Sequence, residues 1–274
     1  MSDITLIDDS EQSSLVTNGL AKNGELYLKK AGSTDAGSIV VYDSGVWKTF
    51  ANEGGAYSNG YSLSLDGTDD YASFSAQTFA DGARTFSAWF KPSSIVSGYK
   101  GIIGGDSHYI GVDLNSKYFL IWDGSTSRYK LYTGTIDTSS WLHVMVVDNN
   151  SGSSGNCVIY VNGTNLGVPA PSANTTNPGS LTFRYIGRKS ADYFPGLIDE
   201  VAIWNSDESA NISQIRDTSG SNPVPGDLSL MTNQPLHWWR MGDNDSGSTI
   251  TDQGSAGVDA TLQNQASFST TVPS

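Results

Sequence analysis

Acidic side chains gather at two places in this sequence of 274 residues. Asp66, Asp69 and Asp70 lie within five residues of one another, and Asp199 and Glu200 lie in an otherwise apolar stretch. Carboxylate oxygens are the ligands that Ca²⁺ prefers in proteins, so the first group could supply a calcium site. The alternative is structural, because Asp residues in turns also accept hydrogen bonds from their own backbone.

Asp199 and Glu200 also raise the possibility of a glycoside hydrolase. Such enzymes need two carboxyl groups that face each other across the scissile bond. Adjacent residues of a strand point to opposite faces, so these two residues alone do not form that pair. No Ser, His and Asp set stands out, and the three histidines have no metal-ligand spacing: His108, His143 and His237. We therefore expect that the protein is not an enzyme.

Aromatic residues with polar neighbours cluster in the middle of the chain, between residues 99 and 132. Aromatic rings stack on the apolar faces of sugars, and Asp and Arg side chains bond sugar hydroxyls. We expect a carbohydrate-binding site formed by Tyr99, Asp106, Tyr109, Trp122, Asp123, Arg128, Tyr129 and Tyr132. An ordinary aromatic sheet surface without a ligand is the alternative.

Short strands must position these residues. Phe86, Ala88 and Phe90 alternate with polar neighbours, which is the period of two that a half-buried strand shows. The segment Trp141–Asp148 is apolar on both faces, as in a strand that is covered on both sides. Turn signals such as Asn162-Gly163 separate the strands, and one helix is expected from about residue 208 to 216. The sequence predicts an all-β protein.

Composition excludes several classes of protein. The net charge is −13, which argues against a nucleic-acid partner because phosphates require a basic surface. No run of eighteen apolar residues occurs, so we expect no membrane insertion. The single cysteine, Cys157, excludes an internal disulfide framework. No basic and then apolar N-terminal segment is present, so we expect no signal peptide.

Five segments resemble, in order and spacing, the laminin G-like branch of the concanavalin A-like lectin/glucanase superfamily. They are LDGTDDY (65–71), TFSAWFKP (85–92), SWLHVMVVD (140–148), IYVNG (159–163) and YIGRKSADYFPGLIDEVAIWN (185–205). The resemblance implies a two-sheet antiparallel β-sandwich, a jelly roll with a short N-terminal arm. It also implies a protein that binds sugars, proteins or calcium more often than it catalyses.

The resemblance implies calcium held by loop carboxylates near one edge of a sheet. We therefore expect Ca²⁺, as the one cofactor, at Asp66, Asp70 and Asp199. Glucanase relatives carry Glu-x-Asp-x-x-Glu on one strand, and the Ile-Asp-Glu-Val-Ala-Ile segment of this chain lacks the third carboxylate. A polysaccharide-degrading enzyme, or the carbohydrate-binding module of one, stays open as an alternative.

Three regions are expected along the chain. Residues 1–56 form an N-terminal arm for attachment, because they hold too little apolar surface to fold alone. Residues 57–220 form the laminin G-like sandwich, and residues 221–274 form a linker and C-terminal strands that complete the same sandwich. The C-terminal segment resembles the one that usually opens such domains.

The amino-acid sequence of the N-terminal region resembles the N-terminal regions of phage virion proteins. This resemblance implies a non-enzymatic virion structural protein, a capsid decoration or fibre component, whose lectin-like domain contacts host surface glycans in host attachment. The expected partners are other virion proteins and further copies of this chain in a homo-oligomer, both joined through the arm. The expected location is the virion surface, after synthesis in the host cytoplasm. A purely structural sandwich without a ligand is a second alternative.

Overall fold

The computed structural model divides the chain into two compact units, Met1–Ser58 and Asn59–Ser274. It describes residues 59–274 except 126, 149–156, 168–177, 219–221 and 244, together with four strands before residue 59. These four strands form one sheet, in which β1 and β2 are parallel and the other pairs antiparallel: β1 (Thr5–Ile7), β2 (Leu26–Lys29), β3 (Ile39–Asp43) and β4 (Val46–Phe50). The rest of the expected arm, 1–56, lies outside the described residues.

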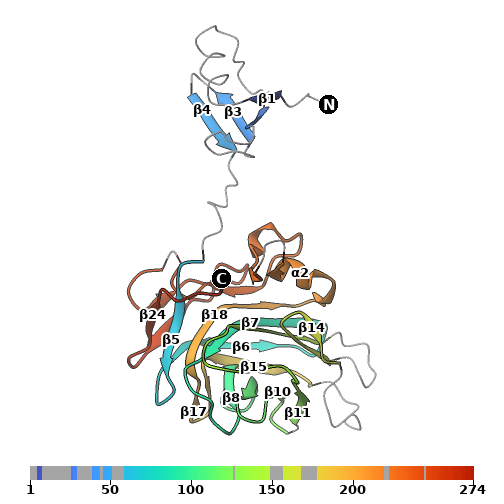
Figure 1. Cartoon of the computed structure of the whole chain (residues 1–274), viewed down its shortest axis with the longest axis vertical. Coiled ribbons are helices and arrows are strands. Elements are labelled where there is room, and N and C mark those ends of the chain that lie inside the picture. Colours follow the sequence, from blue (N-terminus) through green and yellow to red (C-terminus); the bar gives the residue numbers. More distant parts are fainter. Residues whose placement is uncertain are drawn as a thin grey trace. The chain divides into compact units, whose positions relative to one another are not determined.

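Two antiparallel sheets form a sandwich in the second unit, so the predicted fold class is confirmed (Figure 1). Sheet I has the order β11-β10-β9-β8-β15-β6-β23-β22. Its strands are β6 (Tyr71–Phe79), β8 (Lys100–Gly104), β9 (Tyr109–Asp113), β10 (Tyr118–Trp122), β11 (Ser127–Leu131), β15 (Leu181–Ile186), β22 (Thr249–Ile250) and β23 (Ala260–Gln263).

Sheet II has the order β14-β13-β12-β7-β18-β5-β24, and β21 pairs with β18 beside this path. Its strands are β5 (Ser62–Asp66), β7 (Arg84–Pro92), β12 (Leu142–Asp148), β13 (Cys157–Val161), β14 (Thr164–Asn165), β18 (Pro195–Trp204), β21 (His237–Trp239) and β24 (Ser267–Ser269).

Small elements decorate the sandwich. They are the hairpins β16 (Arg188–Lys189) with β17 (Asp192–Tyr193) and β19 (Arg216–Asp217) with β20 (Val224–Pro225), the 3₁₀ turns η1 (Ser209–Asn211) and η2 (Leu228–Leu230), and helix α2 (Ile212–Ile215). The helix expected over 208–216 is thus one 3₁₀ turn followed by a four-residue α-helix. It is held by packing, since Ile215 is buried.

The core lies between the two sheets and follows the alternation of the strands. Phe86, Ala88 and Phe90 of β7 belong to the core, whereas Ser87 and Trp89 lie on the other face of sheet II. This is the inward and outward alternation that the pattern predicts. It fixes which side chains of each strand are available outside the sandwich.

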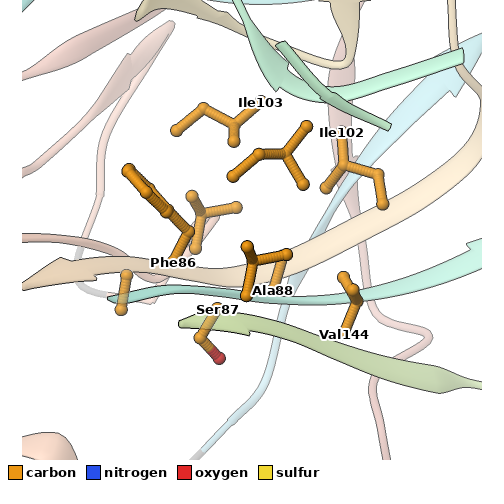
Figure 2. Close-up of a pocket in the computed structure, with 10 residues that line it drawn as sticks. Phe86, Ser87, Ala88, Ile102, Ile103 and Val144 are labelled. Carbon is orange, nitrogen blue, oxygen red and sulfur yellow. The ribbon is translucent and has the colours of Figure 1, made fainter. Parts of the chain in front are cut away.

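A small void lies inside the core, and Figure 2 shows its lining. Phe86, Ala88, Ile102, Ile103 and Val144 are among the residues around it, and it holds only about 10 Å³. That is about the least space that a water molecule needs, and a water would also need polar partners. An apolar void of this size is a packing defect rather than a ligand site.

The C-terminal strands lie in both sheets. β23 pairs with β6, with Ala260 opposite Phe74, and β24 pairs with β5, with Phe268 opposite Leu63. β21 pairs with the long strand β18. The first and last parts of the second unit therefore share hydrogen bonds and one core.

Candidate functional site

The predicted aromatic residues of β9, β10 and β11 lie on the outer face of sheet I. Trp122 is opposite Tyr109, and Leu120 is opposite Tyr129. Phe119 of β10 points into the core, so its neighbours in the strand point outward. Register therefore brings Tyr109, Trp122 and Tyr129 to one face.

Four tyrosines form a cluster on this face. The rings of Tyr118 and Tyr129 meet edge to face with centroids 5.2 Å apart. Burial raises the pKa of Tyr99, and the nearby Asp113, Tyr129 and Tyr118 raise it further. Burial also raises the pKa of Tyr109 to about 12, with Tyr99 as a neighbour. Tyr118 is a residue that sequence reasoning missed, although it lies two residues from Leu120 on the outward face of β10.

The hairpin β16–β17 brings charged groups to the tyrosines. Lys189 Nζ lies 2.6 Å from Asp192 Oδ2 and 5.0 Å from the centre of the Tyr109 ring. Lys100 Nζ lies 3.5 Å from the other oxygen of Asp192. The hydrogen bond from Lys189 lowers the pKa of Asp192, and the charges of Lys189 and Lys100 lower it further.

Glycines allow this hairpin to lie against β8. A β-carbon on Gly104 would lie 2.9 Å from the carbonyl oxygen of Arg188, and one on Gly101 would meet the same carbonyl at 2.9 Å. Any side chain at these two positions would displace the hairpin and with it Lys189. We call the set Tyr99, Tyr109, Tyr118, Tyr129, Lys189 and Asp192 the Tyr109 surface.

Two of the other predicted sugar-binding residues, Tyr132 and Asp123, contact other parts of the chain. Tyr132 packs against the core, with its ring 6.0 Å from that of Phe119. Asp123 accepts hydrogen bonds from the backbone N–H and hydroxyl of Ser125, as a turn residue does. The side chain of Arg128 lies outside the described residues. The prediction that these residues all meet at one site is therefore wrong for Tyr132, which packs on the core side of the sheet, and for Asp123 it stays a prediction.

Asp106 belongs to a second aromatic group on sheet I. It accepts a hydrogen bond from Tyr185 Oη at 3.3 Å. The guanidinium of Arg188 lies 4.3 Å from the Tyr185 ring centre, 4.6 Å from that of Tyr71 and 5.6 Å from that of Tyr193. These three rings therefore already contact a cation of the protein itself, Arg188.

The predicted calcium ligands do not meet. Asp66 is opposite Pro195 in the pairing of β5 with β18, and Asp199 lies four residues farther along β18, a separation of about 13 Å. Carboxylate oxygens of Asp66, Asp69 and Asp70 do lie within 4.8 Å of one another. The expected ligand set of Asp66, Asp70 and Asp199 is therefore corrected to the three carboxylates of one loop.

The carboxylates of this loop also bond its backbone. Asp66 Oδ1 accepts the N–H groups of Thr68 and Asp69, at 2.7 and 3.3 Å, and these bonds lower the pKa of Asp66. Asp70 accepts the N–H of Asp66 at 3.1 Å and that of Gln265 at 2.9 Å. The donor chemistry fits a hard cation, and each oxygen that accepts one N–H keeps a further lone pair.

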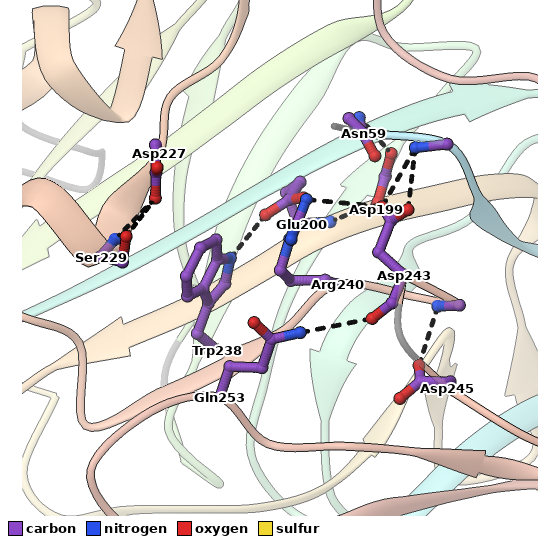
Figure 3. Close-up of polar contacts among 12 residues, drawn as sticks. Asn59, Asp199, Glu200, Asp227, Ser229, Trp238, Arg240, Asp243, Asp245 and Gln253 are labelled. Atoms are coloured by element: carbon purple, nitrogen blue, oxygen red, sulfur yellow. Dashed lines mark hydrogen bonds and ion pairs between the residues drawn. The ribbon is translucent and has the colours of Figure 1, made fainter. Parts of the chain in front are cut away.

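Asp199 lies in a buried polar network, which Figure 3 shows. Asn59 Nδ2 donates to Asp199 Oδ2 at 2.9 Å, and Asp243 accepts the N–H of Gly60. Glu200 accepts from the indole of Trp238 and from Arg240 Nε. Burial raises the pKa of Asp199 well above its ordinary value, and the charge of Glu200 raises it further.

A β-bulge brings these two carboxylates together. The pairing of β18 with β7 shifts between Asp199 and Ala202, and Glu200 has a left-handed φ of 49°. A bulge interrupts the alternation of a strand. The expectation that Asp199 and Glu200 point to opposite faces is therefore wrong, and both side chains are less than 4% exposed.

The histidines have structural surroundings. Burial lowers the pKa of His143 to about 3, and its Nε2 lies 2.8 Å from Ser87 Oγ. His237 Nδ1 lies 2.7 Å from Asp252 Oδ2, and the Thr182 N–H donates to His108 Nδ1. Within the described part of the chain, the Asp66 loop is the one group of three or more potential metal ligands that meet.

The sequence model of the concanavalin A-like lectin/glucanases superfamily matches residues 66–211. Because these are 146 of the 274 residues, the chain belongs to this superfamily, and the predicted kinship is confirmed at that level. No curated protein matches the sequence. The resemblance of the N-terminal region to phage virion proteins stays a prediction.

Solved structures share the fold. A candidate carbohydrate binding protein from Bacteroides ovatus has a TM-score of 0.54 and 17% identity, over 90% of this chain and 70% of that one. The native heptameric SAP-like pentraxin from Limulus polyphemus has a TM-score of 0.46 and 15% identity, over 76% and 98%. Tailspike protein 2 of Escherichia coli O157:H7 bacteriophage CAB120 has a TM-score of 0.39 and 14% identity, over 70% and 31%. The last two scores are too low to support any inference, and the first supports the fold alone.

No helix in the described part of the chain is long and apolar enough to cross a membrane.

Proposed function

We propose that the sandwich binds glycans at the Tyr109 surface. The observation that carries this proposal is the meeting of four tyrosines with the ion pair of Lys189 and Asp192 on the outer face of sheet I. Tyrosine rings offer flat apolar area with a polar end, and a charged pair beside them can bond sugar hydroxyls. Membership of a lectin-like superfamily supports the same chemistry.

The proposed role is non-enzymatic. Asp199 and Glu200 are buried and bonded to Asn59, Trp238 and Arg240, so their oxygens do not face a substrate. A polysaccharide-degrading enzyme would show reducing ends released from polymers that the protein binds. A binding module would release none.

The finer proposal places this protein on a phage virion, as a capsid decoration or fibre component. The N-terminal unit would join it to other virion proteins or to further copies of the chain, and the Tyr109 surface would contact host surface glycans. Support comes from the amino-acid sequence of residues 1–56 and from the division of the chain into two compact units after residue 58. A chain that lacks residues 1–56 should stay soluble and β-rich but fail to join purified particles. Undiminished occupancy of the particle by the shortened chain would contradict this role.

Binding to a glycan array tests the sugar proposal. Tyr109→Ala and Tyr129→Ala each remove a ring from the surface, and a loss of about 1.4 kcal/mol weakens binding about tenfold. Tyr61→Ala is the matched control, because Tyr61 is exposed and directly precedes β5, outside the Tyr109 surface. An array without any hit at high protein density would favour the purely structural sandwich instead.

We also propose that Ca²⁺ binds at Asp66, Asp69 and Asp70. Support comes from three carboxylates whose oxygens lie within 4.8 Å and repel one another without a cation. The ion would have Asp69 as a ligand in place of the distant Asp199. Melting of Asp69→Asn and of Asp199→Asn with and without Ca²⁺ separates these two residues, because only the first should lose the stabilisation by calcium.

A further inference from the structure

A cleft of about 490 Å³ lies on the outer face of sheet II, the sheet that does not carry the Tyr109 surface. Trp89 and Lys91 of β7 line it, and they alternate with core residues of the same strand. Trp141, Asn162 and Arg216 line it from the start of β12, the β13–β14 turn and β19. Its size falls within the range of about 300–1,000 Å³ that small-molecule sites have.

The charge of the cleft is opposite to that of the chain. The sequence has 28 acidic and 15 basic residues, yet the cleft is lined by Lys91 and Arg216 and by no Asp or Glu side chain. Asp137, in the loop that carries the lining residues Ser139 and Ser140, accepts hydrogen bonds from both serines. Ser274, the last residue of the sequence, also lines the cleft. Two cations and no lining Asp or Glu side chain favour an anion as the ligand.

Neither cation is neutralised within the described part of the chain. No carboxylate there lies within ion-pair distance of Lys91 or Arg216. Arg216 Nε is buried without a hydrogen-bond partner, and a buried donor without a partner is costly. Burial also lowers the pKa of Arg216, although a guanidinium stays charged at any ordinary pH. A ligand carboxylate would balance the positive charges of Arg216 and Lys91.

The other lining groups suit a sugar rather than a simple ion. Two tryptophans lie at the cleft, of which Trp89 is buried and Trp141 partly exposed. Asn162 uses its Oδ1 to accept the N–H of His143 at 2.9 Å, so its Nδ2 is the group that it can offer to a ligand. The β13–β14 turn fixes this residue, since Asn162 and Gly163 both have positive φ, 50° and 79°.

We propose that this cleft binds a carboxylate-bearing sugar. The carboxylate lies against Arg216 and Lys91, and the ring of the sugar lies against Trp141 with hydroxyls near Asn162. A planar guanidinium is well matched to a carboxylate because it donates two parallel hydrogen bonds. The cleft and the Tyr109 surface lie on different sheets, so a negative result at one site does not contradict the proposal for the other.

The test uses trigalacturonate and its methyl ester, which differ in charge and not in ring structure. Isothermal titration of the full chain should show binding of the acid at least tenfold tighter than that of the ester, and weakening with added NaCl. Arg216→Gln and Lys91→Gln should each weaken binding of the acid about tenfold or more. Arg184→Gln, which removes an exposed cation on sheet I, should leave it unchanged.

Amide NMR spectra locate the site and report folding of each variant. Addition of trigalacturonate should shift the signals of Trp141 and Asn162, and Tyr109→Ala should leave these shifts intact. Equal affinity for the acid and the ester would overturn the proposal. Unchanged affinity for the acid in both single variants, Arg216→Gln and Lys91→Gln, when both are well folded, would also overturn it. So would full displacement of the sugar by equimolar sulfate, which would reveal an anion site without sugar recognition.

Discussion

The indole of Trp239 packs against the ring of Phe74, with centroids 4.6 Å apart, although 165 positions separate the two residues. Phe74 lies in β6 of sheet I and Trp239 in β21 of sheet II. Trp239 is fully buried, and its Nε1 donates to the carbonyl oxygen of Val258 at 2.9 Å. The contact joins the C-terminal segment to the first strands of the sandwich.

Trp239→Ala should therefore destabilise the sandwich severely. Truncation of a large buried aromatic side chain costs about 3–5 kcal/mol. Urea denaturation followed by tyrosine and tryptophan fluorescence measures the loss. Tyr61→Ala, at an exposed position, should change the free energy of unfolding by no more than about 0.5 kcal/mol. Equal midpoints for Trp239→Ala and the wild type would show that the C-terminal segment is an appendage.

Gly104→Ala should disturb the Tyr109 surface. A β-carbon at this position would lie 2.8 Å from Tyr109 Cβ and 2.9 Å from the Arg188 carbonyl oxygen, so the strand or the hairpin must shift. We expect a loss of about 1–3 kcal/mol in stability, together with weaker glycan binding. Gly82→Ala is the matched control, because the nearest atom to its β-carbon would be 3.9 Å away. The prediction fails if both variants denature at the same urea concentration and bind alike.

Asp199→Asn should change how stability depends on pH. The folded state raises the pKa of Asp199 above the ordinary 3.8, so the folded protein holds a proton that the unfolded chain has lost. The contribution of Asp199 to the free energy of unfolding is therefore fully present below pH 3.8, and it is lost as the pH rises toward the raised pKa. An asparagine carries no charge at any pH, and it could donate to Asn59 Oδ1, which is buried without a partner.

The measurement is the free energy of unfolding of the wild type and Asp199→Asn at several pH values from 4 to 8. Stability of the variant relative to the wild type should rise over this range. A constant difference would mean that Asp199 is ionised throughout the range and that neither burial nor the charge of Glu200 raises its pKa.

Calcium should raise the melting temperature through the Asp66 loop. At a hundredfold excess over its dissociation constant, a ligand of the folded state stabilises by about 2.7 kcal/mol, which is about 5–10 °C for a domain of this size. Asp69→Asn should abolish the rise, because its carboxylate belongs to the loop group. Asp199→Asn should preserve it, since Asp199 lies elsewhere on β18. Superimposable melts of the wild type in Ca²⁺ and in chelator would reduce the three aspartates to turn residues.

The sequence by itself determined the sandwich and the faces of its strands. Because side chains alternate along a strand, Phe86, Ala88 and Phe90 had to share a face, and burial of that face against a second sheet follows. The same rule places Tyr109, Trp122 and Tyr129 on one face once their strands pair. Asn162-Gly163 determined its hairpin because both residues tolerate positive φ.

Only the tertiary structure decided which of these residues meet. Strand pairing sets distances between residues far apart in the sequence, which is why Asp199 lies apart from Asp66 while Lys189 reaches Tyr109. A bulge is a local departure from alternation that no periodic pattern reveals, and it buried Glu200 beside Asp199. The cleft of Lys91 and Arg216 likewise exists because segments from five parts of the chain converge on one face of sheet II, where folding leaves two positive charges without a partner among the described carboxylates.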